Sequence, residues 1–480
     1  MLEMQKRLSK PFFALMTLPA TAMGFALSIQ IAALSAILRS KYDLNLEEIG
    51  LVWAAGPIAG ILGQPIIGMI SDKVWFWGGR RRPFILIGGV MTALALIALP
   101  NIGLISSALG LTEIVGVALA VALVMDLSIN VSFNPTRAVI SDLTPEGELR
   151  TRGYTWMQTV SGTFGMLAYA IGATLGNETL IYTGAGLVLL FTLIPAMLME
   201  EPRELGSEEE NEQKGGFDLR LIAIGTLPLW GIFAYDLYAL VERAFSIERS
   251  GHVIEWACAA ATAILMIWVL FLKKPSAGAG KNDLTEFQKI MAAHSFSWVG
   301  VQTMFVFYYP YLEHVMPDAG SASWGSITNF SFLILNGVAA ALPAFVLNPL
   351  ARKMPRVRLQ AACLAVMSMG YGIAYFAGTS PLALYLIMAI LGVGWAAIVS
   401  LPFAIMSQRI NATRMGLFMG IFNLSVVLPQ LLVSMSIGLL LQRVEDKALL
   451  FAIAAASLAL SALLWLRVKP LPKSEKGENV

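Results

Sequence analysis

Residues 123–142 read LVMDLSINVSFNPTRAVISD, a stretch apolar enough to cross a bilayer that nevertheless carries Asp126, Asn130, Asn134 and Arg137. Charged side chains are costly inside a membrane, and where they occur they face the interior of a helix bundle or a water-filled cavity. The stretch therefore predicts a membrane helix that presents a polar face to a central cavity.

The two charges of this helix are expected to lie on one face. Eleven residues at about 100° each place Asp126 and Arg137 on the same side, about 16 Å apart along the axis, which is too far for direct pairing on a straight helix. Asn130 lies one turn from Asp126 and shares that face. Asp126 falls near the bilayer midplane, where burial favours the neutral carboxyl and makes it a candidate proton site. The alternative is a structural carboxyl that hydrogen-bonds inside the bundle.

The composition is that of a polytopic membrane protein. Of 480 residues, 57% are apolar and 13% are charged, whereas about 25% of a soluble globular chain is charged. The two cysteines, Cys258 and Cys363, stand in apolar runs and are expected to be packed thiols. The three histidines have no ligand spacing, and GAGK at 278–281 lacks the frame of a phosphate-binding loop. We expect no metal and no cofactor beyond a coupling proton, and neither an enzyme nor an ATP-driven pump.

Apolar runs of about 18 to 25 residues predict an all-α protein with about fourteen membrane-spanning helices. We place them at 12–38, 48–71, 83–100, 113–141, 153–175, 179–199, 219–241, 253–272, 286–312, 326–350, 359–377, 382–407, 415–441 and 448–467.

Lysine and arginine indicate the orientation. With a cytoplasmic N-terminus, most of them fall on the inner side, and the outer side receives only Arg39, Lys41, Arg243, Arg249, Arg443 and Lys447. This bias is what the positive-inside rule predicts. Both termini are therefore expected to be cytoplasmic, and the lack of long soluble loops points to a bacterial inner membrane.

The acidic stretch EEPRELGSEEENEQKGG (200–216) divides the chain. The predicted parts are a six-helix bundle (1–200), an acidic cytoplasmic linker (201–218), an extra transmembrane hairpin (219–272), a second linker (273–285), a second six-helix bundle (286–468) and a tail (469–480). Two six-helix halves joined by a polar cytoplasmic segment resemble the plan of the major facilitator superfamily.

A second polar group stands at the predicted cytoplasmic surface, in GMISDKVWFWGGRRRPF (68–84). Asp72 ends one helix, and Arg80, Arg81 and Arg82 precede the next. A carboxylate and arginines so placed can gate a two-state transporter by holding neighbouring helices in one state. The alternative is that the arginines are anchors of the positive-inside kind.

At three places the sequence resembles the sucrose:proton symporters of the glycoside–pentoside–hexuronide:cation symporter family. The matching segments are GPIAGILGQPIIGMISDKVWFWGGRRRPF (56–84), MDLSINVSFNPTRAVISDL (125–143) and GLFMGIFNLSVVLPQLLVS (416–434), the last preceded by SLPFAIMSQ (400–408). The resemblance covers roughly residues 20–200 and 290–440.

The resemblance implies roles for the residues that match. In that family the fourth-helix aspartate acts in proton coupling and at the sugar site, and the arginine eleven residues later acts in sugar transport. These roles pass to Asp126 and Arg137. Three features depart from the pattern: Leu46 stands where plant members have a histidine, 312–325 lacks an expected Arg–Glu pair, and the hairpin 219–272 is an addition.

A sugar site also needs aromatic faces and amide groups at mid-membrane depth. The wider set of candidates is Gln30, Trp53, Gln64, Gln158, Trp298, Gln302, Tyr308, Asn329, Asn336, Trp395, Asn423 and Gln430. Most single polar residues in a bundle only link helices. We predict substrate contacts for Gln64, Asn130, Gln158, Gln302 and Asn423, together with Asp126 and Arg137.

These observations predict a secondary active transporter that imports a disaccharide or glucoside with a proton by alternating access. Its expected partners are the sugar, the proton and the lipid bilayer, without nucleic acid. The oligomeric state and the choice of proton over sodium stay open. The rival hypotheses are a major facilitator carrier of another small solute, and a transporter-like sensor that binds without transporting.

Overall fold

The computed structural model describes residues 3–145, 148–201, 219–245, 251–273, 283–409 and 415–470. Within these ranges the chain is almost entirely helical, and the only β-type pairing is an isolated bridge between Phe76 and Gly79. The all-α prediction is therefore confirmed.

The helices before the acidic linker are α1 (Glu3–Lys6), α2 (Lys10–Ser40), α3 (Leu46–Trp53), α4 (Ala55–Lys73), α5 (Arg82–Ala98), η1 (Leu99–Asn101), α6 (Ile102–Ala108), α7 (Ile114–Leu143), α8 (Glu148–Leu175) and α9 (Asn177–Leu198). The helices of the insert are α11 (Leu219–Gly225), η2 (Leu227–Leu229), α12 (Trp230–Ala244), α13 (Val253–Ile267) and η3 (Trp268–Leu272). The helices after it are α14 (Leu284–Val315), η4 (Pro317–Ala319), α15 (Gly320–Leu342), η5 (Pro343–Leu347), α16 (Asn348–Lys353), α17 (Arg356–Ala377), α18 (Pro381–Ser407), α19 (Met415–Arg443) and α20 (Leu449–Trp465).

Each of the fourteen predicted spans overlaps a helix, but the count of fourteen is not confirmed. In the part of the chain that the structure describes, ten helices are long and apolar enough to cross a membrane, and an eleventh is obtained if one bent pair counts as a single span. The bent pair replaces the predicted continuous span 219–241: Leu219–Gly225 and Leu227–Arg243 meet at 63°. Pro228 lies at this break and has no N–H to continue the helix.

Glycines allow the helices to cross closely. A Cβ on Gly88 of α5 would lie 2.2 Å from Ser132 Oγ of α7, and one on Gly184 of α9 would lie 2.2 Å from Ile29 Cδ1 of α2. Among the later helices, a Cβ on Gly394 of α18 would lie 2.4 Å from Met367 Cβ of α17. No residue larger than glycine fits these crossings unless the neighbouring atoms shift.

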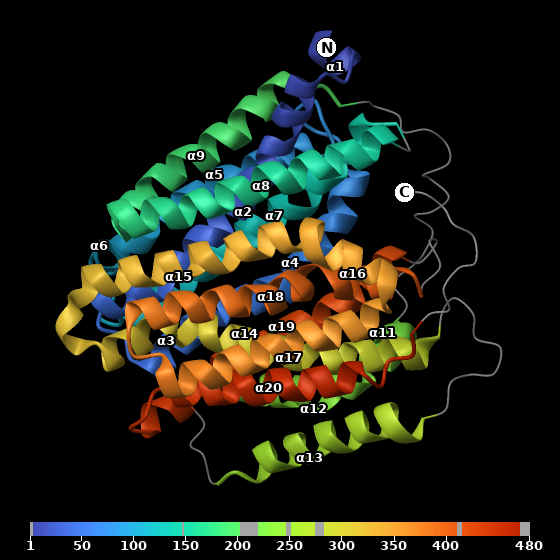
Figure 1. Ribbon diagram of the computed structural model, residues 1–480. Helices are drawn as coiled ribbons and strands as arrows, with labels where there is room; N and C mark the ends of the chain where they lie inside the picture. The colour runs from blue at the N-terminus through green and yellow to red at the C-terminus, as the bar shows by residue number, and fades with distance from the viewer. Residues whose placement is uncertain are drawn as a thin grey trace.

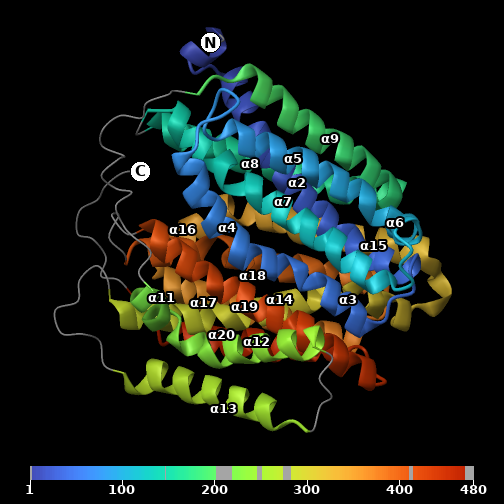
Figure 2. The same ribbon diagram turned by 180° about the vertical axis from the view of Figure 1, so that it is seen from behind.

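The earlier helices α2–α9 and the later helices α14–α20 form two groups that meet along a seam (Figure 1). The main contacts across the seam are α3 with α19 and α8 with α15, with smaller ones between α2 and α14 and between α4 and α19. In Figures 1 and 2 the ribbons of α8 and α15 diverge toward the end at which N is marked. We call this the basic end, because Lys10, Arg80, Arg152 and Arg356 lie there, and the other the opposite end.

Candidate functional site

Asp126 lies in the interior of α7, about 18 Å along the axis from the start of that helix. Its side chain is buried, with 5% of the residue exposed. Gln30 of α2, also buried, donates from Nε2 to Asp126 Oδ2 over 2.9 Å. On the other side stands Gly56 of α4, where a Cβ would lie 3.5 Å from Oδ2. The carboxyl is thus enclosed at the meeting point of three helices.

Asn130 lies one helical turn after Asp126, on the same face of α7. Its Nδ2 donates to the backbone oxygen of Asp126 over 2.8 Å. Gly63 of α4 faces it, and a Cβ there would approach Asn130 Cβ to 3.1 Å. Two glycines of GPIAGILG therefore let α4 pass close to the polar face of α7.

Arg137 is exposed, in contrast to Asp126. Its guanidinium lies 4.1 Å from the centroid of the Phe133 ring, a cation–π geometry. The hydroxyl of Tyr154 in α8 donates to the Arg137 carbonyl over 3.4 Å. Within the described residues Arg137 makes no ion pair, in agreement with the expectation that the two charges of α7 do not meet.

The other predicted substrate residues are dispersed. Gln302 of α14 is buried, and its Oε1 accepts from Gln430 Nε2 of α19 over 3.2 Å. Gln158 is exposed on α8, and Asn423 is half-buried on α19. Gln64 lies in α4, but its side chain falls outside the described residues. The structure therefore brings Asp126 and Asn130 together, and it places the other predicted substrate residues on different helices.

An aromatic–amide cluster contains three of the wider sequence candidates, Trp298, Asn336 and Trp395, together with Tyr169, which the sequence did not single out. Trp395 Nε1 donates to Asn336 Oδ1 over 3.1 Å, and the Trp298 and Trp395 rings lie 5.9 Å apart, edge to face. The Tyr169 side chain lies beside those of Asn336 and Ser28, so α8 approaches α15 and α2 at this point. Helix periodicity alone does not predict this cluster, because its members come from four helices.

The seam is closed at the opposite end. Helices α3 and α19 pack closely here through glycines. A Cβ on Gly50 of α3 would lie 2.6 Å from the backbone oxygen of Ser434 in α19, and a Cβ on Gly438 of α19 would lie 2.4 Å from the backbone oxygen of Leu46 in α3. On the other side of the seam, Ser326 Oγ donates to Ala173 O over 2.7 Å.

An ion pair also joins the two groups at this end. Arg39, at the end of α2, donates from Nε and Nη2 to the two carboxylate oxygens of Glu313 in α14, over 2.6 and 2.9 Å. Asn177 and Asn329 add a side-chain hydrogen bond of 2.8 Å between α9 and α15.

Toward the basic end the polar face of α8 is exposed instead. Tyr154, Thr155, Gln158 and Thr159 follow one another at helical spacing and are all exposed. Such a strip would be unfavourable against lipid, so its exposure indicates a water-accessible surface between the two groups of helices. Together with exposed Arg137, this strip forms a polar, accessible surface toward the basic end, whereas side-chain contacts join the two groups at the opposite end.

Two of the predicted gating residues, Arg80 and Arg81, form an ion-pair network at the basic end. Arg80 Nη2 and Arg81 Nε contact Asp142 Oδ2 at the end of α7, over 2.9 and 3.2 Å. Arg81 Nη1 also donates to Ser71 Oγ of α4 over 2.8 Å. The side chain of Asp72 lies outside the described residues. The described carboxylate partner of the Arg80 and Arg81 side chains is therefore Asp142.

The sequence did not single out Glu201 in this network. Its carboxylate accepts from the backbone N–H groups of Arg80, Arg81 and Arg82 over 2.7, 2.8 and 2.6 Å. A carboxylate at the start of a helix is favoured by the unpaired N–H groups and by the helix dipole. The only signal was an acidic residue directly after a predicted span, which is common in loops.

A similar buried centre occupies the basic end of the later helices. Glu286 of α14 contacts Lys289 Nζ over 2.8 Å and Arg409 Nη1 over 3.5 Å, and it accepts from the backbone N–H of Lys469 over 2.7 Å. Burial lowers the pKa of the Arg409 guanidinium, and Glu286 opposes this shift. The centre ties the start of α14 to the segments that follow α18 and α20.

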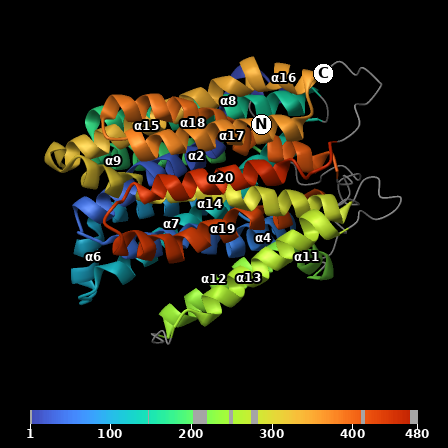
Figure 3. The ribbon, with the colours of Figure 1, turned by 60° about the horizontal axis from the view of Figure 1, so that its bottom comes forward.

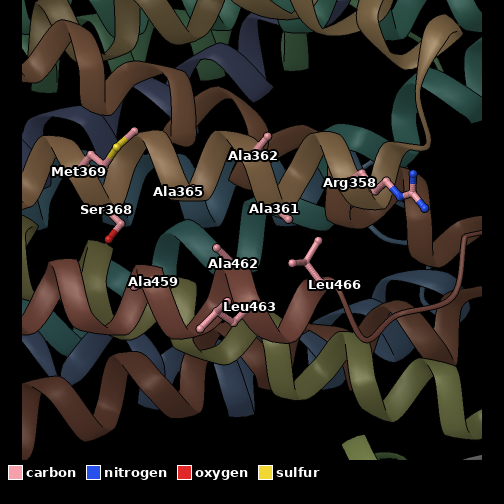
Figure 4. A pocket seen from close by; sticks show the side chains of 10 residues that line it. All are labelled: Arg358, Ala361, Ala362, Ala365, Ser368, Met369, Ala459, Ala462, Leu463 and Leu466. Atoms are coloured by element: carbon pink, nitrogen blue, oxygen red, sulfur yellow. The ribbon is translucent and has the colours of Figure 1, made fainter.

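Neither described cavity is lined by Asp126 or Asn130. A cavity of about 500 Å³ lies between α17 and α20 and is lined mainly by alanine and leucine side chains (Figure 4). Its polar residues are Arg358 and Ser368, and it is typical of a lipid-filled groove. A second cavity, of about 580 Å³, lies at the opposite end around the Arg39–Glu313 pair. Among the described residues no three His, Cys, Asp or Glu are placed to hold a metal, and both cysteines are free.

The comparisons with known proteins agree with this architecture. The model of the Major Facilitator Superfamily matches residues 17–434. Sucrose transport protein SUC4 of Arabidopsis thaliana is 24% identical over 87% of this chain and 82% of its own. Sucrose transport protein SUT2 of Oryza sativa subsp. japonica is 26% identical over 87% of this chain and 84% of its own.

Two solved structures share the fold. The xylose transporter XylE of E. coli, in its inward-open conformation, is 14% identical with a TM-score of 0.64 over 97% of both chains. The POT family transporter PepTSo is 12% identical with a TM-score of 0.65 over 95% of this chain and 96% of its own. The chain therefore belongs to the Major Facilitator Superfamily, a family of transporters and not of enzymes.

Proposed function

We propose that the protein is a secondary active transporter that moves a disaccharide or glucoside together with a proton by alternating access. The observation that carries the proposal is the enclosed Asp126 carboxyl, which lies deep in a membrane helix with Gln30 as its hydrogen-bond donor. The similarity to two sucrose transport proteins along most of the chain supports a sugar as the substrate class.

The proposed sugar site lies between Asp126 and the aromatic–amide cluster. Trp298 and Trp395 offer apolar ring faces on which a pyranose ring stacks, and Asn336 offers an amide to its hydroxyls. Gln302 and Gln430 add two amides from the same side of the seam. Asp126, when neutral, donates to a sugar hydroxyl, and when ionised only accepts.

In the proposed cycle, proton and sugar occupy the site from the opposite end. The neutral carboxyl tolerates burial better than the charged one, so the loaded protein closes over the site and opens at the basic end. Loss of the proton there restores the charge and weakens sugar binding. Arg80, Arg81, Asp142 and Glu201 stabilise the local helix ends that move during this exchange.

We place the basic end in the cytoplasm by the positive-inside rule, with both termini on that side. A bacterial inner membrane fits this orientation. The proton gradient then drives import, because protons enter the site from the more acidic outer side.

The test is uptake of labelled sucrose and maltose into proteoliposomes of the purified protein, with and without an inward proton gradient. We expect accumulation above the external concentration that collapses on addition of an uncoupler. Absence of uptake of both sugars by correctly inserted protein would remove this substrate class.

A further inference from the structure

The insert that follows the acidic linker does not simply lie beside the bundle. Helix α13 packs mainly against α12, whereas α12 also contacts α19 (Figure 3). Ala239 of α12 belongs to a buried cluster with Ala54, between α3 and α4, and with Leu431 and Met435 of α19. One face of α12 therefore covers the seam and touches both groups of helices.

Arg243 reinforces this bridging contact near the opposite end. Its Nη2 donates to Glu47 Oε1 of α3 over 3.1 Å and to the backbone oxygen of Met435 in α19 over 3.3 Å. Helices α3 and α19 are packed there through Gly50 and Gly438. A transporter that opens at the opposite end must separate these two helices, so it must also release one of the two Arg243 contacts.

Asp236 lies on the same face of α12, at the helical spacing 236, 239, 243. It is buried, with 2% of the residue exposed. Among the described residues neither of its carboxylate oxygens has a hydrogen-bond partner. An ionised carboxylate without partners is strongly disfavoured in such surroundings, so the closed seam is compatible with the neutral acid.

No basic group neutralises Asp236 in the described structure. The charged or titratable groups on the elements around it are Glu47 and Glu48 of α3, Tyr235, Tyr238, Glu242 and Arg243 of α12, Glu255 and Cys258 of α13, and Arg443 of α19. Arg243 is engaged with Glu47, and Glu255 with His252. Asp236 lines neither described cavity and is not part of the Asp126 site.

We propose that the insert is a proton-sensitive clamp, in which the neutral Asp236 side chain lets α12 hold α3 and α19 together, and ionisation of Asp236 releases the seam at the opposite end. This proposal rests on the alternating access of the proposed function. It assigns Asp236 as a second proton site, distinct from Asp126. Protonation stabilises the closed seam, and deprotonation favours opening because only water can then solvate the carboxylate.

The experiment measures a distance across the opposite end by electron paramagnetic resonance. Spin labels are attached at Leu109→Cys and Leu382→Cys, two exposed positions on either side of the seam, after replacement of Cys258 and Cys363. The background carries Asp126→Asn, so that titration of the proposed transport site cannot contribute. The pH is raised from about 5.5 to about 8.5, a range over which a buried carboxyl ionises.

We expect the ratio of long to short distances to rise at least about threefold over this range and to stay low and constant in Asp236→Asn. Asp318→Asn, the same change at an exposed site, should retain the response. Arg243→Gln should raise the ratio about two- to fivefold at every pH, because it removes the bridging ion pair.

A pH response that persists in Asp236→Asn overturns the proposal, as does a background that shows no response. If Asp236→Asn fails to fold, Asp236→Leu takes its place, with the same expectation. An unchanged ratio in Arg243→Gln refutes the clamp itself. Because the measurement uses no sugar, failure of sugar transport alone would leave this result intact and remove only the proposed substrate.

Discussion

At the scale of single residues, the central feature is one carboxyl surrounded by α2, α4 and α7. Asp126 could be identified from sequence because a charge in an apolar helix is rare and needs a reason. Gln30 could be named only as one of many polar candidates, since nothing in the sequence says which amide of a distant helix reaches which carboxyl.

We expect Asp126→Asn to abolish accumulation of sugar driven by a proton gradient while sugar exchange continues. The amide keeps the shape of the neutral acid and its hydrogen bonding, but it cannot release a proton. The measurement is uptake and counterflow in proteoliposomes, with Asp318→Asn as the control. Accumulation at the native level in Asp126→Asn would show that the proton binds elsewhere.

Trp395→Ala tests the sugar-binding face. Loss of the indole removes a stacking surface and leaves Asn336 Oδ1 without its donor, so KM should rise about three- to tenfold with a smaller change in kcat. Initial rates over a range of sugar concentrations give both constants. Trp77→Ala, at a residue 67% exposed, should change neither. An unchanged KM in Trp395→Ala would move the sugar site away from this cluster.

At the scale of elements, the sequence predicted the positions of nearly all helices because long apolar runs have few alternatives. It failed at 219–241, where the apolar run hides a sharp bend beside Pro228. It also missed the role of Glu201, because a carboxylate can cap a helix that begins 119 residues earlier only once the fold brings them together.

Close helix crossings give a testable consequence at this scale. Gly88→Ala should lower the free energy of unfolding by about 1–3 kcal/mol, because its Cβ would meet Ser132 Oγ at 2.2 Å and Ser128 O at 2.6 Å. Thermal unfolding in detergent measures this as a fall in Tm. Gly116→Ala in α7, where a Cβ meets nothing within 4 Å, is the matched control. Equal Tm values for the two variants would contradict the crossing.

At the scale of the whole molecule, the contacts of Arg39 with Glu313 and of Asn177 with Asn329 close the seam at the opposite end, and the polar strip of α8 is exposed toward the basic end. The sequence predicted two groups of helices from its hydropathy, but it could not indicate which end is closed. That property depends on contacts such as Arg39 with Glu313, 274 positions apart, whose formation no local pattern encodes.

Breaking this pair should shift the conformational balance. Arg39→Gln or Glu313→Gln should raise the population open at the opposite end about two- to fivefold, because the pair is partly exposed and bridges the seam. The charge-reversed double variant Arg39→Glu with Glu313→Arg should restore the native ratio. The Leu109 and Leu382 labels measure it. Equal ratios in the native protein and both single variants would mean that the pair does not hold the seam.

The central claim is that sugar and proton move together through the site at Asp126. It is tested most directly by adding sucrose or maltose to a weakly buffered suspension of proteoliposomes and following the external pH. The account predicts a sugar-dependent rise in external pH with the native protein and none with Asp126→Asn. Uptake of labelled sugar without any pH change in the native protein would contradict it.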